Sequence, residues 1–351
     1  MGVNITIATG MGEPEFSSNK GLIHGFRSLG HNVEIAGIPY WGRGNDSDIV
    51  FPDKQFPEVY SYRDILEKSR FKEPIIIQLE PHFFLSGPRP PEIKSVYYFT
   101  DAHAAGAMWY KMSQMGNFNT VFCAQKYHIP LFETLPCRVE WLPPGFDDRR
   151  FKKNINPNPQ CHLSFIGYSG IAEIDFPFQD QYGKYTNMPD AMEAAGLNRY
   201  ATKSHTLDYA ERAELLLRLC RDFDVRIYGP IWDAQHFQGA LQTGVIGFHR
   251  SLLHDIAIRI YEVMAAELFL VTDRVPFLEE SIGHAFYRSY NSYYKPFLEN
   301  FDLEYKYIKN IIVSALKNPK REAEANEAKE HAWQNHTWTH RAKRLLEIAL
   351  N

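Results

Sequence analysis

Cysteine is scarce in this chain of 351 residues. There are only four cysteines, and no two of them stand in a C-x-x-C pair or at the spacing of metal ligands: Cys123, Cys137, Cys161 and Cys220. The scarcity argues against a disulfide-stapled fold and against a cysteine-based zinc site. We expect four reduced thiols that pack in the core.

The chain also lacks a long apolar run and a signal-peptide pattern. No apolar stretch approaches the roughly 18 residues that a membrane-spanning helix needs. We therefore expect a cytoplasmic protein with no transmembrane segment.

An excess of basic residues is missing as well. Lys and Arg number 38 against 42 Asp and Glu, which gives a formal net charge of −4. This balance argues against a general attraction to nucleic acid or to anionic membranes, although a local basic cleft stays possible.

Sequence signals for a bound metal are absent too. The 14 histidines show no paired ligand spacing, no D-x-D set follows a strand, and Asp147-Asp148 stands beside a predicted interdomain linker. We expect chemistry that needs no metal.

What the chain does contain is typical of a soluble globular protein, with 44 % hydrophobic and 23 % charged residues. Its length allows two domains with large cores. Aromatic residues are frequent, and such rings can stack on sugars or bases, although most of them fill cores.

The first part of the chain reads as an α/β domain over residues 1–152. A buried strand over 3–10, a helix over 20–29 and a strand over 32–37 form an opening βαβ unit. Gly10 and Gly12 lack the third glycine and the acidic residue of a dinucleotide site, so we expect a tight turn or a floor for a second substrate rather than an NAD site. Further elements are expected in this order: a helix over 61–69 and strands over 74–78, 94–100, 119–124 and 139–142.

A second α/β domain is expected over residues 161–330. The polar segment 153–160 carries two prolines and reads as the linker. Within this domain we expect strands over 162–167, 225–229, 244–248 and 268–273, helices over 209–221 and 301–318, and a charged helix from 321. The helix within 331–351 is expected to return to the first domain. The fold class is thus α/β, two Rossmann-like doubly wound domains facing a central cleft, with ligands at the carboxyl ends of the strands.

A long insertion interrupts the second domain. About 40 residues separate Gly167 from the next predicted helix. Connections of this length inside a compact unit are usually functional, so we expect the segment over about 169–204 to be a lid over the cleft.

One predicted helix, over 254–266, carries a narrow charged stripe. At about 100° per residue, Asp255, Arg259 and Glu262 fall together, and most of the other positions are apolar or small. A helix that is apolar nearly all round is buried, so the stripe is expected to face a cleft. The alternative is a ladder of ion pairs on a solvated face.

Several of these stretches, taken together, resemble two-domain GT-B glycosyltransferases, most closely the spore-maturation-type (CgeB-like) subgroup. The stretches are 96–103, 120–125, 141–147, 259–266, 270–273 and 336–346. The strand entering Thr100-Asp101 and the Arg259…Glu262 helix also resemble, more distantly, the phage DNA β-glucosyltransferase. The resemblance implies a glycosyltransferase of the hexosyl or a related class.

For the donor side, the resemblance implies a nucleotide-diphosphate sugar as substrate and no other cofactor. Glu262 would accept hydrogen bonds from both ribose hydroxyls, and Arg259 would hold the diphosphate with its fork of donors. Gly167 would let the backbone approach the phosphates, and Arg212 is a weaker phosphate candidate. His254, with Asp255 beside it, stands where many retaining enzymes of this fold carry a second glutamate.

For the acceptor side, Asp101 is the candidate catalytic base. It ends an apolar strand, so its carboxylate could take the proton from an acceptor hydroxyl. His103 could orient the acceptor or serve as the base itself. Alternatively, Asp101 caps the following turn. The missing glutamate at His254 favours inversion of the anomeric configuration.

The acceptor itself is not identified by the sequence. A glycan, a protein or a small molecule is expected, and DNA less so, because the acidic balance disfavours a DNA base glycosyltransferase. A non-catalytic nucleotide- or sugar-binding protein is the remaining alternative.

Overall fold

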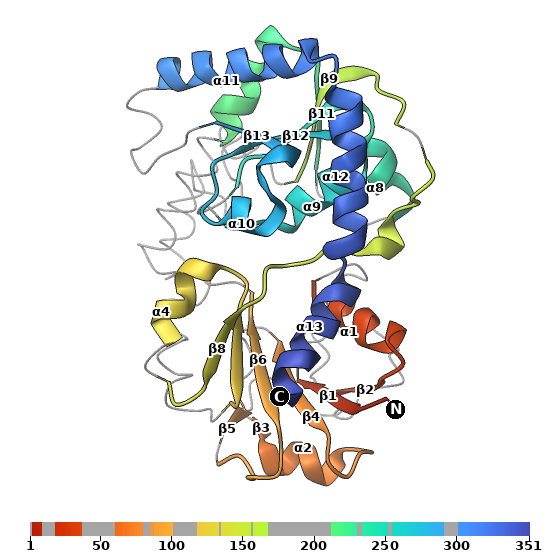
Figure 1. Ribbon diagram of the computed structural model, residues 1–351, viewed down its shortest axis with the longest axis vertical. Helices are drawn as coiled ribbons and strands as arrows, with labels where there is room; N and C mark the ends of the chain where they lie inside the picture. Colours follow the sequence, from red (N-terminus) through yellow and green to blue (C-terminus); the bar gives the residue numbers. More distant parts are fainter. Residues whose placement is uncertain are drawn as a thin grey trace, which may run out of the picture. The chain divides into compact units, whose positions relative to one another are not determined.

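A computed structural model describes most of the chain, namely residues 2–8, 18–36, 60–79, 85–86, 88–100, 118–132, 135–155, 157–167, 212–229, 234–251, 255–290 and 301–351. The chain forms two compact units. Unit 1 comprises residues 1–147 and 335–351, and unit 2 comprises residues 148–334. Figure 1 labels the helices and strands of both.

Unit 1 is built on a parallel sheet of six strands in the order β2-β1-β4-β6-β7-β8. The strands are β1 (Asn4–Ala8), β2 (Asn32–Ala36), β4 (Ile75–Leu79), β6 (Ser95–Phe99), β7 (Thr120–Cys123) and β8 (Arg138–Trp141). Every residue of β4, β6 and β7 is buried. This burial explains their continuous apolar sequences, because helices cover both faces of a parallel sheet.

Short elements complete unit 1: α1 (Ser18–Ser28), α2 (Tyr62–Lys68), α4 (Ile129–Phe132), the 3-10 turn η3 (Lys126–His128), and the two-residue strands β3 (Tyr60–Ser61) and β5 (Leu85–Ser86). The start of α2 is set by a capping box. The Ser61 hydroxyl accepts from the Asp64 amide at 3.1 Å, and the Asp64 carboxylate accepts from the Ser61 amide at 2.9 Å.

The last helix, α13 (Trp338–Leu350), packs along α1 (Figure 1). Gly21 and Gly25 make this approach possible, since a Cβ at Gly21 would overlap the Trp338 indole and one at Gly25 would lie 2.7 Å from the Trp338 carbonyl oxygen. The expected return of the C-terminal helix to the first domain is confirmed.

Unit 2 contains a second parallel sheet, in the order β10-β9-β11-β12-β13. The strands are β9 (Cys161–Ile166), β10 (Val225–Tyr228), β11 (Gly244–Phe248), β12 (Phe269–Asp273) and β13 (Tyr287–Tyr290). The helical elements are η4 (Asp148–Arg150), residues 212–222, α8 (Ala234–Leu241), α9 (Ile258–Ala265), α10 (Leu278–Ile282), η5 (His284–Phe286), α11 (Phe301–Lys317) and α12 (Arg321–Asn335).

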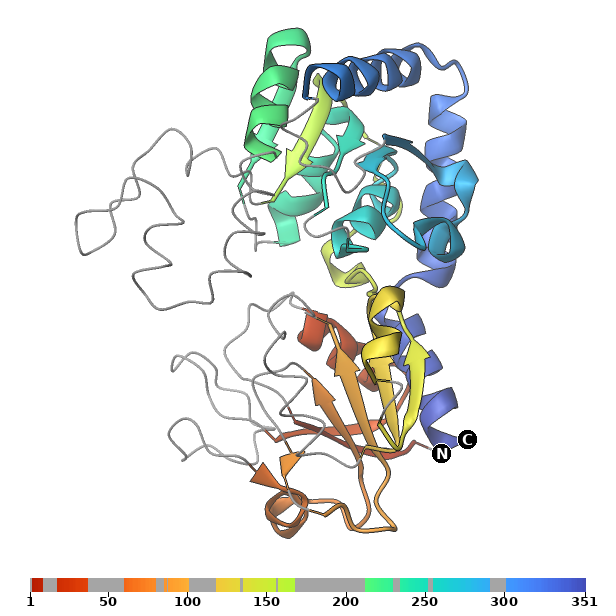
Figure 2. The ribbon, with the colours of Figure 1, turned by 90° about the vertical axis from the view of Figure 1, so that its left-hand side faces the viewer.

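Apolar side chains from the helices fill the core of this unit. Leu215, Leu216 and Leu219 of the 212–222 helix pack against Leu163 and Phe165 of β9. Figure 2 shows this helix in green beside β9. The sheet order changes direction at β9, because β10 lies on one side of it and β11 on the other. In parallel sheets such a reversal creates a crevice at the carboxyl ends of the strands.

The predicted strands are confirmed, with ends that agree to within two residues. The elements α8, α10 and β13 were not anticipated. Three of the four residues of β13 are only half-buried, and it lies at the edge of the sheet, so it lacks an apolar run. Among the described helices, none is both long enough and apolar enough to cross a membrane.

The predicted linker bonds to unit 2. The Ile155 carbonyl accepts from Gln242 Nε2 at 3.3 Å, and the Gln160 amide donates to the Thr243 carbonyl at 2.7 Å. The compact units divide instead between Asp147 and Asp148 and between Gln334 and Asn335. The domain boundaries drawn from composition stay predictions.

Candidate functional site

The candidate site lies at the carboxyl ends of the central strands of unit 2. The register pairs Ser164 of β9 with Gly247 of β11, and Phe248 of β11 with Val271 of β12. If that register is continued past the strand ends, Gly167 after β9, Arg250 after β11 and Asp273 at the end of β12 come opposite one another.

Helix α9 follows β11 and supplies two of the predicted site residues. It begins at Ile258, after an extended Ala257 (φ −84°, ψ 149°), and not at His254 as the periodicity predicts. Asp255 therefore precedes the helix, and its predicted place on one stripe with Arg259 and Glu262 is wrong. The apolar periodicity was misleading because Ile256 is buried although it lies in an extended segment. Its burial therefore does not require a helix.

Arg259 and Glu262 share a face of α9 as predicted, and they form an ion pair of 2.7 Å between Nη1 and Oε2. The other carboxylate oxygen, Oε1, accepts from Arg150 Nη1 at 3.0 Å. Arg150 ends η4 and was not identified from the sequence, because no local pattern connects it with a helix about a hundred residues later. Glu262 thus lies between two guanidinium groups.

An aromatic ring supports the same two arginines. The guanidinium carbon of Arg150 lies 3.5 Å from the ring centroid of Phe237, and that of Arg259 lies 4.7 Å from it. Phe237 belongs to α8, is fully buried, and meets Phe151 edge-on at 5.7 Å. Cation–π contacts of desolvated guanidinium groups contribute about 2 kcal/mol or more.

The three charged side chains differ in how far they are exposed to solvent. The Glu262 side chain is 4 % exposed and that of Arg150 is 6 % exposed, whereas that of Arg259 is 20 % exposed. A solvated ladder of ion pairs is therefore wrong as an account of this stripe. Arg259 Nη1 is buried and makes no well-directed hydrogen bond, although it is close to Glu262. The exposed fifth of this side chain is the part that a ligand could reach.

A second polar group surrounds Asp273, the last residue of β12. Its carboxylate accepts from the Ser251 amide at 2.8 Å, from the Ser251 hydroxyl, and from Arg250 at 3.5 Å. Burial raises the pKa of Asp273, but the Arg250 guanidinium and the hydrogen bonds from Ser251 outweigh burial, and the pKa is lowered. The group is therefore a buried carboxylate that holds the loop after β11.

Gly167 and Arg212 complete the predicted donor residues that the structure describes. Gly167 follows β9 with φ +140°, and a Cβ there would meet only the Phe165 ring, at 4.0 Å. Arg212 is the first described residue of the helix over 212–222, is buried, and donates to the Arg250 carbonyl at 2.6 Å. Both lie at the carboxyl edge of the sheet, as expected.

Other predicted residues lie outside the described part of the chain. These are Gly10, Gly12, Asp101, His103 and His254, together with the insertion over about 169–204. Among the residues that are described, no group of three or more His, Cys, Asp and Glu side chains could hold a metal ion.

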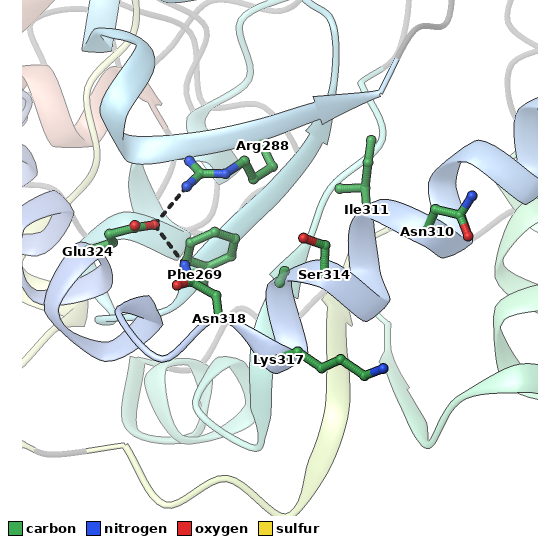
Figure 3. A pocket seen from close by; sticks show the side chains of 9 residues that line it. Phe269, Arg288, Asn310, Ile311, Ser314, Lys317, Asn318 and Glu324 are labelled. Atoms are coloured by element: carbon green, nitrogen blue, oxygen red, sulfur yellow. Dashed lines mark hydrogen bonds and ion pairs between the residues drawn. The ribbon is translucent and has the colours of Figure 1, made fainter.

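A hollow of about 610 Å³ lies at the other end of the same sheet (Figure 3). It is lined by Phe269, the first residue of β12, and by residues of β13, α11 and α12. Two of its three charged groups are paired with each other, since Arg288 contacts Glu324 at 2.9 Å and Glu324 also accepts from Asn318 at 3.2 Å, and Lys317 is the third. We therefore place the functional site at the carboxyl edge and not here.

A sequence model of the family described as glycosyl transferase-like matches residues 212–347, which include Arg212, α9 and β12. A comparison with curated protein sequences gives no match.

Among solved structures, the chain is similar to WaaG, a glycosyltransferase involved in lipopolysaccharide biosynthesis, with 13 % identity, 98 % of this chain and 99 % of that chain covered, and a TM-score of 0.57. It is similar to an alpha-glucosyltransferase in complex with UDP-glucose and DNA (12 %, 100 % and 100 %, TM-score 0.54). It is also similar to a glycosyltransferase from Rickettsia africae ESF-5 (12 %, 99 % and 98 %, TM-score 0.53).

At these identities the likeness shows the fold, and the spore-maturation-type subgroup stays a prediction. The two parallel sheets, each flanked by helices, together with these neighbours, show that the chain has the GT-B fold of two Rossmann-like domains, and its residues 212–347 match a glycosyl transferase-like family.

Proposed function

We propose that the protein transfers a sugar from a nucleotide-diphosphate sugar to an acceptor hydroxyl. The observation that carries the proposal is Arg259, a partly exposed guanidinium held by Glu262 and Phe237 at the carboxyl edge of unit 2. A planar fork of donors suits diphosphate oxygens, and the family match to 212–347 supports a sugar-nucleotide ligand.

In this proposal the diphosphate lies against Arg259 and the turn at Gly167. The missing side chain at Gly167 lets the backbone approach the phosphates, and Arg212 adds positive charge nearby. Arg259 then neutralises the leaving diphosphate, so that no metal is required. Asp255 and His254 precede α9, and we propose that they contribute to the donor side.

Glu262 is proposed to bind the ribose, under a condition that its surroundings impose. Each of its oxygens already contacts one guanidinium, and the side chain is 4 % exposed. Each oxygen has a second lone pair, but a ribose can reach it only if the Arg259 side chain moves. The alternative within the same proposal is that Glu262 positions Arg259 and touches no substrate.

On the acceptor side, we propose Asp101 as the base of an inverting transfer, with His103 orienting the acceptor or acting as the base itself. In the sequence, Asp101 comes two residues after Phe99, the last residue of β6. The carboxylate would take the hydroxyl proton as that oxygen attacks the anomeric carbon. Gly10 and Gly12 would line the acceptor side, and the insertion over about 169–204 would close over the bound substrates.

The test is a panel of nucleotide sugars in calorimetry, combined with a hydrolysis assay for released sugar. We expect binding of at least one, its loss in Arg259→Ala, and turnover reduced by about 10²-fold or more in Asp101→Asn with binding unchanged. Turnover should survive a chelator. The proposal is wrong if no nucleotide sugar binds or reacts. Activity abolished by chelator and restored by Mn²⁺ would contradict the metal-free version only.

A second candidate, transfer to a DNA base, is favoured by one observation. The chain shares its fold over its full length with the alpha-glucosyltransferase solved with UDP-glucose and DNA. The net charge of −4 counts against DNA as the acceptor. A glycan, a protein or a small molecule is therefore favoured over DNA. Transfer to duplex DNA that falls steeply with salt would decide for it.

A further inference from the structure

His249 stands directly after β11, in the middle of the sheet of unit 2 and within the candidate site. Its backbone is fixed on two sides, because its amide donates to the Val271 carbonyl at 2.9 Å and its carbonyl accepts from the Tyr290 hydroxyl at 3.0 Å. The ring therefore starts from a rigid position at the carboxyl edge, one residue before Arg250.

The side chain of His249 is buried, yet one ring nitrogen is unused. The residue is 6 % exposed, and Nε2 makes no hydrogen bond within the described part of the chain. Leaving a buried polar atom unsatisfied costs about 1–3 kcal/mol, so an unpaired nitrogen at a candidate site calls for an explanation, and a bound ligand is one.

Burial and three neighbouring guanidinium groups keep this ring neutral. Burial and the guanidinium groups of Arg212, Arg259 and Arg250 lower the pKa of His249 to about 3, and Asp273 opposes them without prevailing. At neutral pH the imidazole therefore has one N–H and one lone pair.

The surroundings indicate which nitrogen has the hydrogen. Three guanidinium groups act on this ring, and a lone pair on Nε2 would attract one of their N–H groups. None donates to it. We therefore assign the hydrogen to Nε2. This nitrogen is then a hydrogen-bond donor, like the guanidinium groups near it.

We propose that His249 donates a hydrogen bond from Nε2 to a phosphate oxygen of the donor's diphosphate. The inference rests on the proposed function, because it needs an anionic ligand at this edge of the sheet. A neutral donor adds no charge that would hold the product, and its bond strengthens as negative charge collects on the leaving diphosphate. At the neighbouring turn, a Cβ on Gly167 would meet only the Phe165 ring, at 4.0 Å, so no side chain of that residue stands in the way of an anion.

The test compares three replacements of His249 in the whole protein. Gln places an amide N–H near the position of Nε2, Asn does not reach it, and Leu removes the donor. The tightest binder among UDP, GDP, ADP and CDP is used, followed by its monophosphate and its nucleoside. We expect His249→Leu and His249→Asn to weaken diphosphate binding about tenfold or more and His249→Gln about threefold at most, with nucleoside binding unchanged.

The outcomes separate the two levels of the argument. If the wild type binds none of the four diphosphates, the proposed function fails and the role of His249 fails with it. If the wild type binds and His249→Leu binds equally well, or loses nucleoside and diphosphate affinity alike, only the role of His249 is wrong. Should these variants not fold, ¹⁵N NMR of wild-type histidines decides, since an unprotonated Nε2 in the bound state would contradict the proposal.

Discussion

Arg150 and Glu262 form a buried ion pair with 3.0 Å between Nη1 and Oε1, although they lie 112 positions apart in the chain. Arg150 comes from the first turn of unit 2, and Glu262 comes from α9. The pair therefore ties the entry of the chain into unit 2 to the helix that holds Arg259.

Arg150→Ala should destabilise the protein by about 3–5 kcal/mol, because it leaves Glu262 with one partner in a buried site. The measurement is the free energy of unfolding in urea. The control is Lys153→Ala, which breaks an exposed ion pair with Glu330 of 2.8 Å and should cost about 1 kcal/mol or less. Equal losses in the two variants would show that the buried Arg150 pair stabilises the protein no more than an exposed ion pair does.

Glu262→Gln should weaken binding of a nucleoside diphosphate by about 1–3 kcal/mol. A double-mutant cycle with Arg259→Ala separates the two roles of this residue. If Glu262 binds ribose, the loss persists in the Arg259→Ala background and is also seen with the free nucleoside. If Glu262 only positions Arg259, the loss vanishes in that background. Unchanged affinity for every nucleotide in Glu262→Gln would rule out both roles.

Gly25→Ala should destabilise unit 1 by about 1–3 kcal/mol, because its Cβ would lie 2.7 Å from the Trp338 carbonyl oxygen, where α13 crosses α1. Gly239 provides a matched control in α8, where a Cβ meets nothing within 4 Å. Gly239→Ala should raise the free energy of unfolding by up to about 1 kcal/mol. A stable Gly25→Ala protein would mean that the two helices separate at little cost.

His249 should make the protein lose stability in mild acid. Its folded pKa of about 3 lies below the usual 6.5, so below pH 6.5 the unfolded chain takes up a proton that the folded chain refuses. The free energy of unfolding is thus lost as the pH falls from 6.5 toward 3, by about 2 kcal/mol at pH 5. His249→Gln should remove this loss between pH 7 and pH 5, whereas His284→Gln, at an exposed position, should retain it. Parallel pH profiles for wild type and His249→Gln would contradict the neutral buried state.

Much of the fold followed from local pattern. The apolar runs of β4, β6 and β12 predict buried parallel strands, and the restart at β9 predicts a second sheet. The positions of Arg259 and Glu262, three apart on a helix, also predict their contact. Such inferences succeed because the period of burial is a property of one element and needs no knowledge of its neighbours.

The site needed tertiary structure. Arg150, Phe237 and His249 carry no motif, and they meet α9 only because the order of strands in unit 2 brings η4, α8 and the end of β11 to one edge. The start of α9 was likewise decided by packing, since the extended turn at Ala257 removes Asp255 from the helix. By itself the sequence determined most of the strands and helices, the two parallel sheets and the charged pair on α9. Only the tertiary structure decided which distant side chains surround that pair, because contacts between remote residues depend on topology and burial and not on local period.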